Sequence, residues 1–159
     1  MSVALWRIAA DTPQYESTDL SGKGAEMTGG RWNRPGLAVV YASTSIALAC
    51  LETVVHLNAA GGLPLNRYLV RIDVDDASWQ APITVDPSRL VGWDAEPAGR
   101  VSLDWGDQWL RGKSSLLASV PSIVVPEECN VLINPAHSRH ADTRATKLRR
   151  WLYDPRLAQ

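Results

Sequence analysis

Glu52 is the residue of this sequence whose setting most suggests chemistry. It is a carboxylate inside an otherwise apolar segment, IALACLETVVHLN, in which its helical neighbours include Leu48, Ala49 and Val55. A carboxylate among apolar side chains is costly unless it has a partner or faces a cavity, and such carboxylates gather at catalytic sites. An exposed glutamate that shares a polar stripe with His56 fits the same pattern. The sequence pattern therefore favours neither a functional Glu52 nor an ordinary exposed one.

Arg31 is a candidate for binding an anion. It follows Gly29 and Gly30 in the segment GGRWNRPG. Glycines let the backbone come close to a ligand, and a guanidinium binds phosphate through two parallel hydrogen bonds. The segment matches neither the P-loop nor the GxGxxG pattern. A glycine-rich hairpin with surface arginines explains the same residues, and the segment taken alone favours that simpler interpretation.

Ser122 and Asn130 are further candidates, because they lie in a proline-framed polar stretch, VPSIVVPEECN, between two expected strands. Such a stretch suits the rim of a pocket. No GxSxG elbow surrounds Ser122, so it is not expected to be a nucleophile. His137 and His140 lack an accompanying carboxylate or thiol at the spacing of a zinc site, which favours a solvated loop there and predicts no metal.

Composition narrows the class of protein. The chain has 159 residues, 16 basic and 17 acidic, for a net charge of −1, which argues against a dedicated nucleic-acid binder. No apolar run reaches the length of a membrane helix, and the N-terminus lacks the pattern of a signal peptide. Two cysteines without a CxxC motif argue against a disulfide scaffold. We therefore expect a cytoplasmic protein that does not enter a membrane.

Tryptophan and arginine are used heavily, with 7 Trp and no Phe, and with 13 Arg against 3 Lys. These side chains suit sites that stack rings and bind anions. Core filling by tryptophan is the simpler explanation, and composition alone favours it. The C-terminal stretch 139–159 carries six basic and two acidic residues, which fits either a partner surface or an ordinary solvated face.

The expected elements indicate one α+β domain over residues 1–159, with several short strands in mixed small sheets around one strong helix. The helix is IALACLETVVHLN, capped by one of the serines or threonine at 43–45, ending near Asn58, closed by Gly61-Gly62 and buried on nearly all sides. A second helical spacing covers 99–112. Strands are expected at 3–8, 37–42, 65–75, 116–125 with a break at Pro121, and 131–135; the segment 147–157 fits strand or helix.

Read together, these segments resemble the RES-domain family, the toxins of bacterial Res–Xre toxin–antitoxin pairs. The matches occur in order along nearly the whole chain. They are LWRI at 5–8, GGRWN at 29–33, VVYAS at 39–43, LET at 51–53, PSIVVPEECNVLINPAH at 121–137 and LYDPRL at 152–157. No single motif is decisive, but their order and spacing are specific.

The resemblance implies a fold related to ADP-ribosyltransferases and an activity that consumes NAD+ by cleaving its nicotinamide–ribose bond, with water or phosphate as acceptor. The family's conserved positions fall on Arg31, Tyr41, Glu52 and Ser122. Such a cleavage passes through an oxocarbenium-like state, which Glu52 would stabilise, while Arg31 would hold the pyrophosphate. Tyr41 would stack on nicotinamide. Ser122 would bind the ribose or orient Glu52, and we place Asn130 with the substrate-binding residues.

Two other classes of function stay open. One is an ADP-ribosyltransferase that modifies a host protein through the same site. The other is a non-enzymatic RNA- or protein-binding module, against which the charge and the lack of an RNA-binding motif speak. The resemblance also implies a cognate Xre-type antitoxin, in a complex that can hold more than one copy of each protein. No cofactor other than NAD+ as substrate is expected, and no metal.

Overall fold

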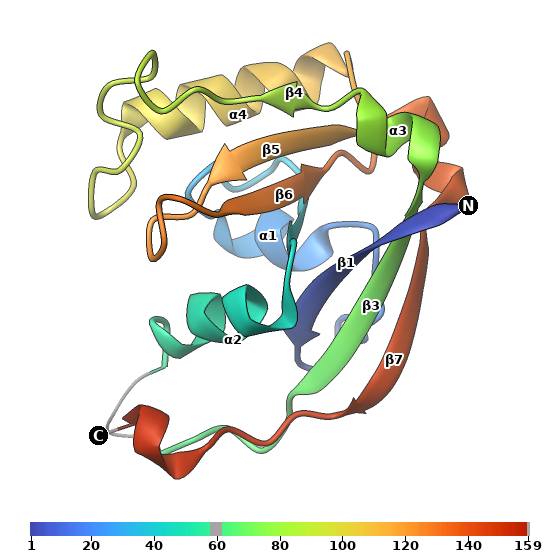
Figure 1. The fold of residues 1–159 in the computed structure, drawn as a ribbon, viewed down its shortest axis with the longest axis vertical. Coiled ribbons are helices and arrows are strands. Elements are labelled where there is room, and N and C mark those ends of the chain that lie inside the picture. The colour runs from blue at the N-terminus through green and yellow to red at the C-terminus, as the bar shows by residue number, and fades with distance from the viewer. Residues whose placement is uncertain (58–61, 159) are drawn as a thin grey trace.

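Strand pairing joins segments from the whole length of the chain. The computed structural model describes residues 1–57 and 62–158. The strands of these residues form one sheet in the order β4-β5-β6-β2-β1-β3-β7, antiparallel throughout except between β4 and β5 (Figure 1). Their bounds are Ser2–Ala9 for β1, Val40–Ser43 for β2, Tyr68–Asp75 for β3, Ile83–Thr84 for β4, Leu117–Pro121 for β5, Cys129–Ile133 for β6 and Arg144–Arg150 for β7.

The sheet consists of two halves that meet where β2 lies beside β1. In the described residues, only one pair, Trp6 opposite Ser43, connects them. The largest apolar cluster contains side chains of both halves, such as Val40 and Ile133 from one and Leu5 and Ile72 from the other. Because these side chains bury one another, the sheet is bent about the β1–β2 junction, as Figure 1 shows.

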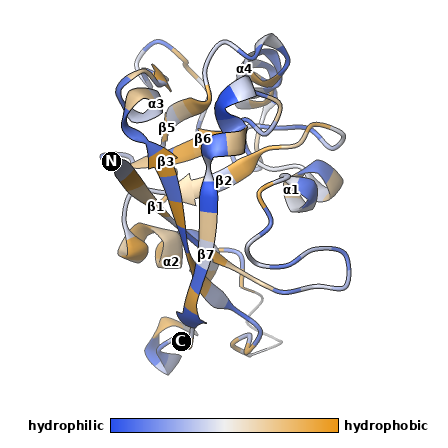
Figure 2. Cartoon of the chain, turned by 90° about the vertical axis from the view of Figure 1, so that its right-hand side faces the viewer, coloured by the Kyte–Doolittle hydropathy of each residue, from blue (hydrophilic) through white to orange (hydrophobic). Residues whose placement is uncertain are grey.

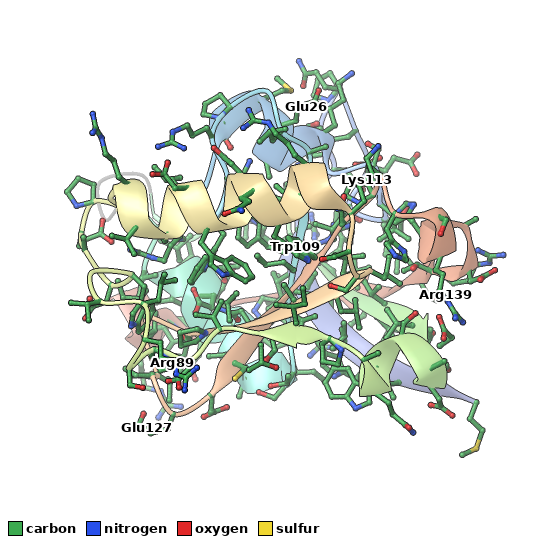
Figure 3. All side chains as sticks on the ribbon, turned by 90° about the horizontal axis from the view of Figure 1, so that it is seen from above. Glu26, Arg89, Trp109, Lys113, Glu127 and Arg139 are labelled. Atoms are coloured by element: carbon green, nitrogen blue, oxygen red, sulfur yellow. The ribbon has the colours of Figure 1, made fainter. Side chains whose placement is uncertain are left out.

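Helix α4, Arg100–Gly112, covers the half formed by β5 and β6. Trp109 lies on the side of α4 that faces the strands (Figure 3) and donates a hydrogen bond from Nε1 to Ser115 Oγ, 3.0 Å away. Trp32 and Trp93 pack in the same cluster, with stacked rings 6.4 Å apart. These tryptophans therefore fill the core, as the simpler explanation of the composition predicts.

Helix α2, Ile46–Val54, follows β2 directly and carries Glu52. Ser45 caps it by accepting a hydrogen bond from the Leu48 amide at 3.1 Å, which confirms the predicted cap. One side of α2 packs against β1 and β3, where Ala49 meets Ile8 and Leu69.

The prediction that this helix is buried on nearly all sides was wrong. Leu51 is 37% exposed and Val55 is 54% exposed, since only one side of α2 packs on the sheet. The helix is also shorter than 45–58, because the last turn tightens through the bond from the His56 amide to the Thr53 carbonyl. The predicted end at Asn58 and Gly61 lies outside the described residues.

Other elements also differ from the sequence predictions. The strand expected from 37 begins only at Val40, and α4 rather than α2 is the longest helix described. The second strand predicted after Pro121 was wrong, because residues 122–128 form a loop whose bend is held by Ser122. Three short helices were not predicted in detail: α1 at Lys23–Thr28, α3 at Asp76–Gln80 and the 3-10 turn η2 at Ser138–Asp142.

The segment 147–157, for which the sequence fitted strand or helix, continues strand β7 and then forms a 3-10 turn at Pro155–Ala158. Strand β7 is an edge of the sheet and is largely hydrophilic (Figure 2). The predictions at 3–8, 99–112 and the stretch after Asn130 are confirmed, as is a single α+β domain, and the strand predicted at 65–75 is present from Tyr68. Within the residues described, no helix is both long enough and apolar enough to cross a bilayer.

Candidate active site

The Glu52 carboxylate is held by two side chains that lie 70 and 78 positions later in the sequence. Ser122 donates from Oγ to Glu52 Oε1 at 2.5 Å, and Asn130 donates from Nδ2 to the same oxygen at 2.7 Å. Glu52 is half-buried. In the part of the chain that is described, Oε2 accepts no protein hydrogen bond. One oxygen is therefore fixed by the protein and the other is available to a ligand.

Ser122 uses its whole hydrogen-bonding capacity inside the protein. A hydroxyl has one proton to donate and two lone pairs to accept with. Ser122 Oγ accepts from the amides of Val124 and Val125, both at 3.1 Å, and it donates to Glu52. The side chain is fully buried. Of the two roles expected for Ser122, this geometry fits the orientation of Glu52.

Asn130 is oriented in turn by Ser43, a residue that sequence reasoning missed. Ser43 Oγ donates to Asn130 Oδ1 at 2.7 Å, so the amide group presents its nitrogen to Glu52. Ser43 is buried at the end of β2, directly opposite Asn130 in β6. The signal was present in the motif VVYAS, since Tyr41 and Ser43 are two residues apart on a strand and so share a face.

Tyr41 is bound by the segment that contains Arg31. Its hydroxyl donates to Asn33 Oδ1 at 2.7 Å and accepts from the Trp32 amide at 3.0 Å. Burial raises the pKa of the phenol well above its usual range, which keeps the hydroxyl protonated. A Cβ at Gly30 would lie 2.6 Å from the Tyr41 hydroxyl oxygen. The absence of a side chain at Gly30 therefore makes room for Tyr41, whereas the sequence had offered close approach of a ligand as one of two explanations for this glycine.

Arg31 is largely buried and already bonded. Its side chain is 14% exposed, so the description as a surface arginine was wrong. Nη1 donates to the carbonyls of Trp93 and Ala95, at 3.1 and 2.7 Å, and Nη2 contacts Glu96 Oε2 at 2.6 Å. Glu96 is 74% exposed. A phosphate that binds Arg31 would compete with the exposed Glu96 carboxylate or use the hydrogen-bond donors of Arg31 that remain.

The structure thus gathers the predicted residues into two groups. Glu52, Ser122 and Asn130 form one, and Arg31 and Tyr41 belong to the other. The groups meet along β2, where Tyr41 and Ser43 lie on the same face about 7 Å apart, two residues along the strand. Tyr41, Ser43 and Asn130 therefore share one face of this half-sheet, and the segment that contains Arg31 is joined to that face through the hydroxyl of Tyr41.

Two surface hollows lie outside the carboxylate group. One borders the second group and is lined by residues such as Gly30, Asn33 and Pro97. The other lies between the end of α4 and the segment after β6, at Leu110, Lys113 and Asn134. Neither includes Glu52. We locate the candidate site by the hydrogen bonds to Glu52, because these connect groups with a chemical role.

The histidines at 137 and 140 lie in and beside η2 and not in a solvated loop, so that prediction was wrong. His137 Nδ1 accepts a hydrogen bond from the Arg139 amide at 3.2 Å, and both side chains are half-buried. The described residues contain no group of three His, Cys, Asp or Glu side chains placed to hold a metal ion. The absence of a metal from the reaction stays a prediction.

Basic side chains of the stretch 139–159 bind their own domain. Arg139 pairs with Asp75 at 2.8 Å and Lys147 pairs with Asp11 at 2.8 Å. Arg150 donates from Nε to the carbonyl of Leu65. These contacts favour the interpretation of this stretch as part of the domain surface.

Known proteins resemble this chain over nearly its full length. The family model of the RES domain matches residues 4–154. The "Prs ADP-ribosylating toxin" of Sphingobium sp. (strain YBL2) is 58% identical over 158 residues, which is 99% of this chain and 98% of that protein. "Toxin Res" of Yersinia enterocolitica is 36% identical over 91% of this chain and 93% of its own length. "Toxin Res" of Pseudomonas putida is 39% identical over 84% of this chain and 85% of its own length. Because the family model and these relatives span almost the whole chain, the protein belongs to the RES domain family, to which these toxins also belong.

Proposed function

We propose that this protein is a toxin that consumes NAD+ by breaking the bond between nicotinamide and ribose. The observation that carries the proposal is the Glu52 carboxylate, with Oε1 held by Ser122 and Asn130 and Oε2 directed to no described protein donor. A carboxylate held in this way is preorganised, so it does not have to reorient when positive charge develops next to it.

Glu52 acts on the charge of the transition state. As the bond to the cationic nicotinamide breaks, the ribose takes on oxocarbenium character, which a nearby carboxylate stabilises. The free Oε2 can also accept a hydrogen bond from a ribose hydroxyl. Ser122 and Asn130 position Glu52 through Oε1, and Ser122 is not a nucleophile, because its hydroxyl proton and both lone pairs are engaged.

Arg31 and Tyr41 complete the proposed site. The guanidinium of Arg31 contributes positive charge to the side of the site where the pyrophosphate would bind, once the ion pair between Arg31 and Glu96 has opened. The Tyr41 ring offers an apolar surface next to Ser43, and its hydroxyl holds Asn33 and the backbone of Trp32. We propose that the site works by these fixed charges and dipoles, with no metal.

The acceptor of the ADP-ribose defines two versions of the reaction. Water or phosphate gives a glycohydrolase or a phosphorylase. The relative from Sphingobium, which is named for ADP-ribosylation of Prs, supports a protein acceptor, since 58% identity over the full length makes a shared acceptor reasonable. We propose the cleavage of NAD+ for both versions and take Prs as the first protein acceptor to test.

The test is to incubate the purified protein with NAD+ in three reactions, without phosphate, with phosphate, and with purified Prs. Mass spectrometry of the small molecules and of Prs then identifies the acceptor. ADP-ribose, ADP-ribose 1″-phosphate or a modified Prs each supports the cleavage and selects one version. Intact NAD+ in all three reactions, with a folded protein, contradicts the proposal and favours a binding module.

We further propose that an Xre-type antitoxin restrains the protein in the cytoplasm. A toxin that drains NAD+ or modifies a host enzyme requires restraint in its own cell, and the relatives named Toxin Res support such a pairing. An acidic side chain or a chain terminus of the antitoxin could occupy the anion-binding part of the site. Co-expression, purification of the complex and an NAD+ assay test this, since full activity in the intact complex contradicts direct occlusion.

A further inference from the structure

A continuous row of side chains leads away from the residue that holds Glu52. Ser43 lies opposite Asn130 on β6 and opposite Trp6 on β1, and Trp6 lies opposite Arg71 on β3. Residues directly opposite each other in antiparallel strands project to the same face, with Cβ atoms about 5 Å apart. The row Asn130, Ser43, Trp6 and Arg71 therefore crosses from one half of the sheet to the other.

The helix that carries Glu52 packs on this same face. Ala49 of α2 meets Ile8 and Leu69 in an apolar cluster to which Trp6 adds its partly buried ring. Figure 1 shows β1 and β3 side by side next to α2. Arg71, two residues along β3 from Leu69, is beyond this cover, and its side chain is 44% exposed. Helix α2 thus covers this face of the sheet at Ile8 and Leu69, and the face is exposed to solvent at Arg71.

The guanidinium of Arg71 has one edge, at Nη1, that is available to a ligand. Nε and Nη2 both contact Asp73 Oδ1, at 3.0 and 2.9 Å, which fixes the orientation of the group. Within the described residues, Nη1 donates to no protein acceptor. Arg31 differs, because Nη1 donates to two carbonyls and the side chain is largely buried.

We propose that Arg71 is a second guanidinium for the pyrophosphate of the dinucleotide, in addition to the charge that Arg31 contributes, with the Trp6 ring between the phosphates and the ribose at Glu52. The inference rests on the proposed function, since it takes NAD+ as the substrate. A pyrophosphate carries two anionic groups, and a guanidinium with an open edge binds such oxygens through parallel charge-assisted hydrogen bonds. Arg71 supplies this group on the face that Asn130 and Ser43 share.

The experiment compares wild type with Arg71→Gln and Arg71→Ala. Gln keeps the aliphatic part of the side chain without the charge, so it separates binding from folding. We expect the KM for NAD+ and the Kd for ADP-ribose, the latter by calorimetry, to rise about tenfold or more, with kcat within about twofold of wild type. The Kd for adenosine, which has no phosphate, should stay unchanged.

The matched control is Arg156→Ala, since Arg156 is also an exposed arginine paired with a nearby aspartate, Asp154, at 2.7 Å. It should leave the KM and the Kd as in wild type. A KM and a Kd within about twofold of wild type for folded Arg71→Gln would overturn the inference while NAD+ turnover by wild type upholds the proposed function. Conversely, Arg71-dependent binding of ADP-ribose without any turnover of NAD+ supports the inference and contradicts the proposed reaction.

Discussion

The sequence resemblance assigned Glu52 and Arg31 to two positions of one family pattern, yet the structure surrounds their side chains differently. Glu52 has one oxygen held by Ser122 and Asn130, and its second oxygen meets no described protein donor. Arg31 is buried against two carbonyls and paired with Glu96. The first group is ready for a ligand, whereas the second already has protein partners. A match of motifs therefore identifies candidate residues but does not show which of their polar atoms are free to bind a ligand.

The elements that support the two groups explain this difference. Glu52 extends from a helix toward the ends of β5 and β6, which are fixed by the sheet. Arg31 lies in a turn closed by the isolated bridge between Gly30 and Asn33, and this turn has to bind its neighbours to keep its shape. Substitutions of Glu52 or of the residues that hold it should therefore act mainly on kcat. Substitutions of Arg31 or of its partners should act mainly on KM or stability.

Replacement of Glu52 should have the largest effect on activity. Glu52→Gln keeps the shape and removes the charge, and we expect a fall in kcat of about 10²–10³, with Glu52→Ala at least as low. The measurement is NAD+ consumption by purified variants with wild-type melting temperatures. Activity retained by Glu52→Gln would mean that the residue acts by hydrogen bonding and not by charge.

Ser122→Ala should have the next largest effect. It removes a donor to Glu52 and leaves the Val124 and Val125 amides without their acceptor. We expect kcat to fall about tenfold and stability to fall by about 1–3 kcal/mol. Steady-state kinetics and thermal unfolding measure both. A covalent ADP-ribose adduct on Ser122 of wild type would instead show a nucleophile and reject the positioning role.

Ser43→Ala probes the outer part of the same group. Without the Ser43 hydroxyl, Asn130 Oδ1 loses its donor, so the amide holds Glu52 less firmly. We expect kcat to fall about three- to fivefold, which corresponds to the loss of one ordinary hydrogen bond, and Ser43→Thr to restore most of it.

A double-mutant cycle makes the Ser43 prediction specific. If Ser43 acts through Asn130, then Ser43→Ala should add little to the loss caused by Asn130→Ala, and the two effects on kcat should be far from additive. Independent, additive losses would show that Ser43 supports the strand end and does not position the site.

Glu96→Gln tests the other side of the comparison. The substitution removes the carboxylate that pairs with Arg31 at 2.6 Å. An exposed ion pair of this kind contributes about 0.2–1 kcal/mol, so we expect the KM for NAD+ to fall by at most about fivefold, with kcat unchanged. A KM that rises instead would indicate that Glu96 holds Arg31 in a shape the substrate needs.

Tyr41→Phe should have the smallest effect on turnover, within about twofold, because the ring stays in place. Its effect should appear in stability, since the Trp32 amide and Asn33 Oδ1 each lose a partner. Burial raises the pKa of Tyr41, so the folded protein favours the neutral phenol and loses this stability as the pH rises above about 10. Unfolding curves at pH 8 and above pH 10 should show a smaller decrease for Tyr41→Phe than for wild type.

The sequence predicted the elements where local pattern and packing agree. Alternation over 65–75 predicted β3, and the spacing of Trp105 and Trp109 predicted α4, because each pattern matches the face that the element buries. The strand predicted after Pro121 failed because the Ser122 hydroxyl binds the amides of Val124 and Val125 and bends the chain. Side-chain bonds of this kind compete with strand formation, and hydropathy does not record them.

For the candidate site, the residue types named Glu52, Ser122 and Asn130 as candidates, and the resemblance to the RES-domain family was what associated them with NAD+ chemistry. Their division of roles depended on hydrogen bonds across 70 and 78 positions of sequence, which exist because the fold places Glu52 of α2 beside Ser122 and Asn130. The same holds for Ser43 and Arg71, whose importance arises from the neighbours that strand pairing places beside them. A hydrogen bond acts only over the few ångströms between its atoms, so the sequence determined which groups were present and the fold decided which of them meet.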